Sequence, residues 1–191
     1  MQFADIIGQK ETKQQLAELV QHNRLSHALL FLGKEGSGSL SLAIAFAQYV
    51  VCEKVNGGKS GVGSQESGPS LFGEPENSNV EPPTLNDSCG VCPACQKAQQ
   101  LIHPDIHFSY PTVTKKPGEK PVATDFITDW REFVKLSPYG NSYDWIEQIK
   151  EKENSQGKIT AEECNDIIRK LSLKSFESVY KILIMWMPEM L

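Results

Sequence analysis

Three cysteines stand close together in the middle of the chain, where Cys89, Cys92 and Cys95 form the pattern C-x2-C-x2-C. Three thiolates at this spacing can bind one Zn²⁺ at Zn–S distances of about 2.3 Å and leave a fourth tetrahedral position. Cys52, which follows an apolar segment, is the predicted fourth ligand, because the 36 residues between Cys52 and Cys89 can close that loop. With four cysteine ligands the site would be closed and structural rather than catalytic.

Other side chains compete for the fourth position, and another chemistry competes for the cluster itself. Cys164 lies within a predicted helix, where a small core residue is the simpler interpretation, and His103 is a second competitor. Cys92 and Cys95 also match the C-x-x-C pattern of thiol–disulfide exchange sites, which is a redox alternative. The neighbouring Cys89 favours the metal site over that alternative.

A second group of residues follows the pattern of a phosphate-binding loop, G-x-x-x-x-G-K-[ST]. Such a loop binds phosphate through backbone N–H groups, while its lysine neutralises phosphate charge and its hydroxyl binds Mg²⁺. Gly33 and Gly38 have the required spacing and Gly36 adds flexibility, but Ser39 stands at the lysine position and Leu40 at the hydroxyl position. This pattern predicts a phosphate-loop backbone with weak or no nucleotide binding. A plain strand–turn–helix is the alternative interpretation.

The end of the last predicted strand tests the same interpretation independently. An ATPase of this type needs an acidic residue there to hold Mg²⁺, but the apolar run 182–185 is followed by Trp186 and Met187. The nearest acid, Glu189, comes after Pro188 and is displaced from the strand end. Two separate catalytic positions are apolar, so competent ATP hydrolysis is not expected and no catalytic residue is predicted.

Alternating helices and strands must position these groups. Hydrophobic periodicity predicts helices at 9–23, 40–51, 125–136, 143–149 and 161–171, and strands at 28–32, 106–110 and 180–186. Thr160 and Glu163 match a capping box at the start of the last helix. The alternation favours an α/β fold with a parallel sheet. Residues 55–88, rich in Gly, Ser, Asn and Pro, are predicted to form a flexible surface insertion.

Composition narrows the class of protein. The 191 residues include 19 Lys and Arg against 24 Asp and Glu, and the resulting net charge of -5 argues against a free-standing nucleic-acid binder. An apolar fraction of 39% permits a packed core. No apolar run approaches the roughly 18 residues of a membrane span. Without a secretory signal a cytoplasmic protein is predicted, in which the five cysteines are thiols or metal ligands.

Together these features resemble the N-terminal part of the bacterial clamp-loader subunits of DNA polymerase III. The resemblance is carried by the four cysteines, the glycine-rich loop and the segments 7–9, 24–31, 103–105 and 180–184, which read IGQ, RLSHALLF, HPD and YKILI. It implies a P-loop NTPase (AAA+) fold, in which helices flank a parallel sheet and the zinc knuckle of residues 52–95 is inserted.

Within that family the gamma/tau subunits hydrolyse ATP and the delta-prime subunit does not. Ser39, Leu40, Trp186 and Met187 place this chain with the delta-prime type. The alternatives are a gamma/tau subunit and a zinc or dithiol module unrelated to replication. The resemblance implies the stationary member of a pentameric clamp loader, with delta and gamma/tau subunits as partners. The sliding clamp and primed DNA would be reached through that assembly, and no membrane would be involved.

The resemblance also implies that residues 1–191 are a partial AAA+ domain. In the family's sheet a further strand lies between the strand before the glycine-rich loop and the strand at 180–186. That strand, the lid, the C-terminal collar and the family's arginine finger would all follow residue 191. An unpaired strand edge is unfavourable, so the natural chain is expected to continue beyond Leu191.

Overall fold

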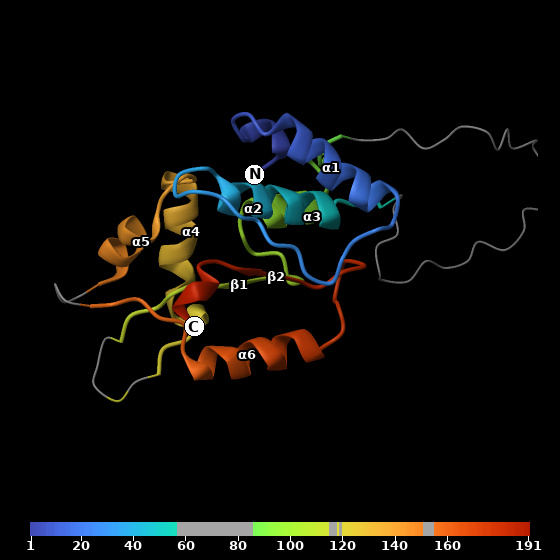
Figure 1. The fold of residues 1–191 in the computed structure, drawn as a ribbon. Helices are drawn as coiled ribbons and strands as arrows, with labels where there is room; N and C mark the ends of the chain where they lie inside the picture. Colours follow the sequence, from blue (N-terminus) through green and yellow to red (C-terminus); the bar gives the residue numbers. More distant parts are fainter. Residues whose placement is uncertain (57–85, 115–117, 119, 151–154) are drawn as a thin grey trace, which may run out of the picture.

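The computed structural model describes residues 1–56, 86–114, 118, 120–150 and 155–191 (Figure 1). Most of the predicted insertion at 55–88 lies outside the described residues. The helices are α1 (Lys10–Gln21), α2 (Ser39–Val51), α3 (Pro93–Gln99), α4 (Ile127–Leu136), α5 (Ser142–Ile149) and α6 (Ala161–Ser172). The strands are β1 (Ile106–Ser109) and β2 (Ile182–Met185), and short 3₁₀-helices are η1 (Phe3–Asp5), η2 (Ala123–Phe126) and η3 (Pro188–Met190).

Strands β1 and β2 pair in parallel, with Ile106 opposite Ile182 and Ser109 opposite Met185. Parallel neighbours need a long crossover, and the chain between them carries α4, α5 and α6. In Figure 1, α2 and α3 lie on one side of the strands and α6 on the other. The predicted α/β class with a parallel sheet is confirmed at this level. Among the described residues, no helix has the length and apolar character needed to cross a membrane.

Helix α2 lies at the centre of the packing. Its sequence is apolar almost all round, and every residue except Ser39 and Ala43 is buried. A helix that is apolar on all sides is stable only when it is covered on all sides. One part of α2 packs with η1 and α1 through Phe3, Ile6 and Leu16. The remaining buried apolar residues of α2 pack in a second cluster with residues of β1, β2, α3, α4 and α5.

A group of aromatic side chains joins α4 and α5 to the ends of the strands. Trp130 of α4 is fully buried, and it stacks on Tyr110 with ring centroids 4.0 Å apart. It also meets Trp145 of α5 edge-on at 5.3 Å and Trp186, just after β2, at 5.4 Å. Two buried polar groups of these rings have partners: Trp145 Nε1 donates to the Pro111 carbonyl at 2.7 Å, and the Tyr110 hydroxyl donates to that of Ala123. The buried Trp130 Nε1 has no hydrogen-bond partner among the described residues.

The predicted strand at 28–32 is wrong, because this segment has no regular secondary structure. Leu30 and Leu32 are 80% and 88% exposed, whereas Phe31 packs against Phe46 of α2 at 6.1 Å. A strand requires a hydrogen-bonded neighbour, and among the described residues the sheet contains only β1 and β2. The apolar run therefore indicated strand propensity, but this structure provides no partner for it.

The capping box predicted at α6 forms only in part. The Thr160 hydroxyl accepts a hydrogen bond from the Glu163 N–H at 3.2 Å, as expected of an N-cap. The buried Glu163 carboxylate, however, accepts from the backbone N–H of Ala123 at 2.7 Å instead of reaching back to Thr160. Glu163 thus ties α6 to η2, which lies 40 residues away in sequence.

The aromatic group predicts a large effect of Trp130→Ala. Removing a fully buried indole leaves a cavity, so the free energy of unfolding should fall by about 3–5 kcal/mol in urea titrations. Leu136→Ala at the end of the same helix is the control, because Leu136 is 74% exposed, and it should stay within about 0.5 kcal/mol of the parent. Equal losses in the two variants would contradict this description of the core.

Candidate metal centre and glycine loop

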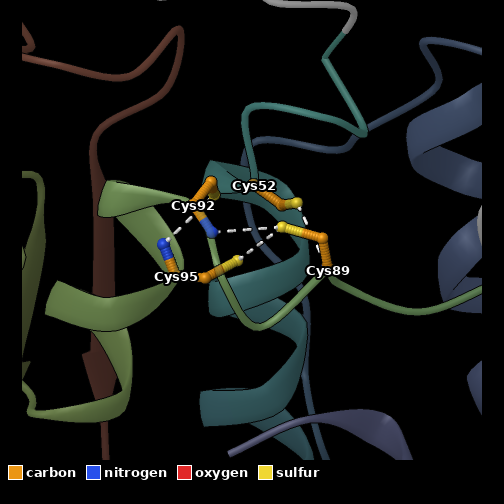
Figure 2. Close-up of side chains that lie close together, drawn as sticks. All are labelled: Cys52, Cys89, Cys92 and Cys95. Atoms are coloured by element: carbon orange, nitrogen blue, oxygen red, sulfur yellow. Dashed lines mark hydrogen bonds between the residues drawn. The ribbon is translucent and has the colours of Figure 1, made fainter.

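The four cysteines singled out by their spacing meet at one point, here called the cysteine cluster (Cys52, Cys89, Cys92 and Cys95). Cys52 comes from the C-terminal end of α2, and the others come from the turn before α3 and its first residues (Figure 2). All four Sγ atoms lie within 4.8 Å of one another, and those of Cys89 and Cys95 are 3.9 Å apart. Tetrahedral Zn–S bonds require sulfur separations of about 3.8 Å. The donor set and its spacing fit a closed structural zinc site.

Local backbone geometry brings the sulfurs together. Cys92 is the N-cap of α3, and its sulfur accepts from the Cys95 N–H at 3.5 Å, with Pro93 at the first helical position. The Cys89 sulfur accepts from the Cys92 N–H at 3.4 Å, and the Cys52 sulfur accepts from the Cys89 N–H at 3.4 Å. Backbone donors of this kind stabilise thiolates and orient metal ligands.

The pKa values of the clustered cysteines shift in opposite directions. A hydrogen bond from Cys95 lowers the pKa of Cys52, and the same bond raises the pKa of Cys95. Burial raises the pKa of Cys92. Binding of a divalent metal ion would release the protons that the four thiols carry.

The competing ligands lie elsewhere. Cys164 is on α6 and His103 follows α3, and neither belongs to the group of close ligand atoms found in the described part of the chain. The Nδ1 atom of His103 instead accepts from the backbone N–H of Asp105 at 3.1 Å. The geometry therefore selects Cys52 as the fourth sulfur.

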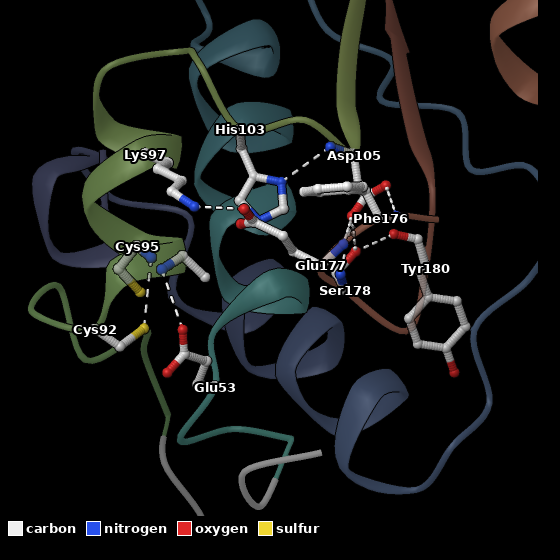
Figure 3. Close-up of polar contacts among 11 residues, drawn as sticks. Glu53, Cys92, Cys95, Lys97, His103, Asp105, Phe176, Glu177, Ser178 and Tyr180 are labelled. Atoms are coloured by element: carbon white, nitrogen blue, oxygen red, sulfur yellow. Dashed lines mark hydrogen bonds and ion pairs between the residues drawn. The ribbon is translucent and has the colours of Figure 1, made fainter. Parts of the chain in front are cut away.

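Asp105 is an organising residue whose role the sequence did not reveal. Its carboxylate is fully buried and accepts from the backbone N–H groups of Phe176 at 2.6 Å, Glu177 at 2.7 Å and Ser178 at 2.9 Å (Figure 3). Burial alone would raise the pKa of Asp105, but these hydrogen bonds outweigh it and lower the pKa below its ordinary value. Asp105 thereby fixes the segment that leads into β2, while its own carbonyl accepts from the Ile182 N–H.

The same segment is tied to the helix of the cysteine cluster. Lys97 of α3 forms an ion pair with Glu177, and the buried His103 Nε2 lies 4.0 Å from the same carboxylate. Burial lowers the pKa of His103, which keeps the ring neutral. Figure 3 shows these groups side by side between α3 and the segment before β2. The cysteine cluster and the strand start are thus linked through one short chain of contacts.

The glycine loop (Gly33–Gly38) leads directly into α2, as its pattern predicted. Gly33 and Gly36 are exposed, whereas Gly38 is buried and serves as the N-cap of α2 with φ +80°. Ser39 is half-buried, and Leu40 is buried. A helix therefore follows the loop, but among the described residues 1–32 no strand precedes it. Of the strand and the helix that flank a phosphate-binding loop, the structure has the helix after Gly38 but not the strand before Gly33.

The positions where an ATPase needs metal-binding groups are occupied by core side chains. Leu40 and Trp186 are both 8% exposed and belong to the same buried cluster. Trp186 packs on Trp130 and, at 5.8 Å, on Phe133. Met187 has a left-handed backbone with φ 56° and turns the chain into η3. No oxygen ligand for Mg²⁺ is presented by these side chains.

The N-terminal region matches known proteins. Residues 8–68 match the family described as DNA polymerase III, delta subunit. DNA polymerase III subunit tau/gamma of Haemophilus influenzae is 44% identical over 50 residues, which are 26% of this chain and 7% of that protein. No solved structure matches the chain. The chain thus has an N-terminal region of the DNA polymerase III clamp-loader type, and the match spans a small fraction of the relative's length.

The cysteine cluster predicts that the purified protein carries about one zinc ion per chain. The zinc should be lost in Cys92→Ser and in Cys52→Ser, since three thiolates hold the metal less well than four, and retained in the matched control Cys164→Ser. Elemental analysis by mass spectrometry after purification without chelators measures this. Protein without metal that forms a reversible disulfide between Cys92 and Cys95 would support the redox alternative instead.

Asp105→Asn tests the link to β2. The variant should lose about 2 kcal/mol of unfolding free energy at pH 7, because charged hydrogen bonds to three N–H groups are weakened. Because folding lowers the pKa of Asp105, its stabilisation is complete above the unfolded value of about 3.9 and is lost as pH falls through the folded value. The difference between parent and variant should therefore shrink below about pH 4.

The control for this comparison is Glu132→Gln, at an exposed position of α4, which should change stability by no more than about 0.5 kcal/mol. Denaturant titrations between pH 2 and pH 7 provide the measurement. A stability difference for Asp105→Asn that stays constant over this range would show that the buried carboxylate is not the stabilising charge.

Proposed function

We propose that this chain acts in a DNA polymerase III clamp loader as a subunit of the delta-prime type, one that helps to load the sliding clamp onto primed DNA without hydrolysing ATP. The match of residues 8–68 and the similarity to a tau/gamma subunit support the clamp-loader class. The parallel pairing of β1 and β2 and the position of α2 after the glycine loop support a P-loop domain of the AAA+ type.

One observation carries the non-hydrolysing part of the proposal: Leu40 and Trp186 are packed into one apolar core. A triphosphate site needs a cation beside the phosphates and oxygen ligands for Mg²⁺, which together contribute several kcal/mol to the transition state. Ser39 supplies no charge at the first position, and Leu40 and Trp186 supply no ligand at the others. Hydrolysis at this loop would lack each of these contributions.

The cysteine cluster has a structural role in the proposal. Four thiolates complete the coordination of Zn²⁺ and leave no open position for a substrate or a water molecule. The proposed zinc joins the end of α2 to the start of α3, and α3 in turn contacts the segment before β2 through Lys97 and Glu177. Zinc here would stabilise the surface of a cytoplasmic replication protein whose partners are delta and gamma/tau subunits.

A second candidate function is an ATP-hydrolysing gamma/tau subunit. The 44% identity to a tau/gamma subunit over 50 residues favours it. The residues at the loop and after β2 favour the delta-prime type instead, so measured turnover separates the two candidates.

The proposal predicts that the natural full-length protein, tagged and purified from its own cells, brings down the other clamp-loader subunits in fixed proportion. The tagged Cys164→Ser variant should behave identically, because Cys164 lies outside the cysteine cluster. Absence of DNA polymerase III subunits from the purified complex would contradict the clamp-loader function.

ATP turnover by the isolated protein should not exceed background, because the loop lacks its cation and its metal ligands. Turnover that survives purification and falls in Lys34→Ala, at an exposed lysine of the loop, would instead establish the gamma/tau type. Phosphate release from MgATP measures this directly, with a known gamma/tau subunit as the positive control.

A further inference from the structure

The turn between α4 and α5 lies against the glycine loop. Ser137 and Gly140 close this turn through a hydrogen bond from the Gly140 N–H to the Ser137 carbonyl at 2.9 Å, which leaves Pro138 and Tyr139 at its tip. Figure 1 shows the end of α4 beside the loop that leads into α2. Segments about 100 residues apart in sequence therefore meet at the N-terminus of α2.

Pro138 and Tyr139 at the tip each accept a hydrogen bond from another segment of the chain. The Pro138 carbonyl accepts a hydrogen bond from the hydroxyl of Ser41, a buried residue in the first turn of α2. The Tyr139 hydroxyl accepts from the backbone N–H of Ile7 at 2.9 Å. Beyond the turn, the Ser142 hydroxyl donates to Glu35 in the glycine loop at 3.4 Å. The turn thus bridges the N-terminal segment, the glycine loop and α2.

The tyrosine ring covers Gly38 closely. A Cβ atom placed on Gly38 would lie 2.6 Å from Tyr139 Cε1, which is closer than carbon atoms approach one another. Gly38 also has φ +80°, a conformation that other residues adopt with strain. Glycine is therefore required at position 38 both by its left-handed backbone conformation and by the Tyr139 ring, which leaves no room for a Cβ atom.

A phosphate-binding loop places anionic oxygens against the N-terminus of the following helix, where the backbone N–H groups and the helix dipole favour negative charge. In this structure the Pro138 carbonyl accepts from the side-chain hydroxyl of Ser41 in the first turn of α2, and the Tyr139 ring packs against Gly38 at the end of the loop. The turn therefore places an acceptor oxygen and an aromatic ring beside the N-terminus of α2, next to the place where the motif would receive a ligand.

We propose that the Ser137–Gly140 turn is an intramolecular ligand of the glycine loop, which closes the loop against nucleotide and holds it to the N-terminal segment. A carbonyl oxygen carries only a partial charge, so it requires neither the lysine nor the Mg²⁺ that a triphosphate needs. Serine at position 39 and leucine at position 40 are compatible with such an occupant. This role rests on the proposed non-hydrolysing function, and it makes the glycine loop a structural contact rather than a nucleotide site.

Amide hydrogen exchange in the full chain tests the contact without any nucleotide. Tyr139→Phe keeps the ring and removes the acceptor of the Ile7 N–H, so exchange at Ile7 should become about tenfold faster. Tyr143→Phe, at an exposed tyrosine of α5, is the matched control and should leave Ile7 unchanged. Equal Ile7 exchange in the parent and in Tyr139→Phe would overturn the proposal.

Nucleotide binding tests the closure itself. Ser39→Lys restores the loop cation, and calorimetry with MgATP should show at least about tenfold tighter binding when Tyr139→Ala is added, because the covering ring is removed. Equal affinities in Ser39→Lys and in the double variant, including no binding by either, would overturn the closure. These outcomes do not depend on partner subunits, so they separate failure of this inference from failure of the proposed clamp-loader function.

Discussion

Four sulfur atoms at the C-terminal end of α2 set the arrangement on which much of the remaining structure depends. Cys52 is the C-cap of the buried central helix α2, whereas Cys89, Cys92 and Cys95 follow a stretch of 36 intervening residues. Helix α3 has only seven residues, too few for stability on its own, so its position depends on the sulfurs and on packing against α2. The ion pair between Lys97 and Glu177 holds α3 to the segment before β2, and Asp105 fixes that same segment through its hydrogen bonds.

Leu40 and Trp186, which cannot bind Mg²⁺, both lie in the buried core. A hydroxyl at position 40 or a carboxylate at position 186 would have to be buried among aromatic rings, at a cost of several kcal/mol without a metal ion or another partner. Leucine and tryptophan avoid this cost, both belong to the same buried cluster, and Trp186 packs on Trp130 and Phe133. In the non-hydrolysing subunit that we propose, positions 40 and 186 would therefore contribute to the stability of the core, and the glycine loop would serve as a fixed turn.

Local pattern predicted much of this molecule. The periodicity of apolar residues indicated helices α1, α2, α4, α5 and α6, and the strands at 106–109 and 182–185 were expected within one or two residues. Cysteine spacing identified the cluster. The strand at 28–32 failed because strand formation depends on a neighbour, which a single segment cannot specify. Asp105, Glu163 and Tyr139 were missed as organising residues because their partners lie 40 to 132 residues away and are backbone N–H groups, which leave no signature in sequence.

The central claim is that four cysteine sulfurs and one zinc ion join α2 to α3. X-ray absorption at the zinc edge of the purified full-length protein tests this claim most directly, because it reports which elements surround the metal and at what distance. The structure predicts a shell of four sulfur neighbours at about 2.3 Å. A shell that includes imidazole nitrogen, or a protein that carries no zinc at all, would contradict the account.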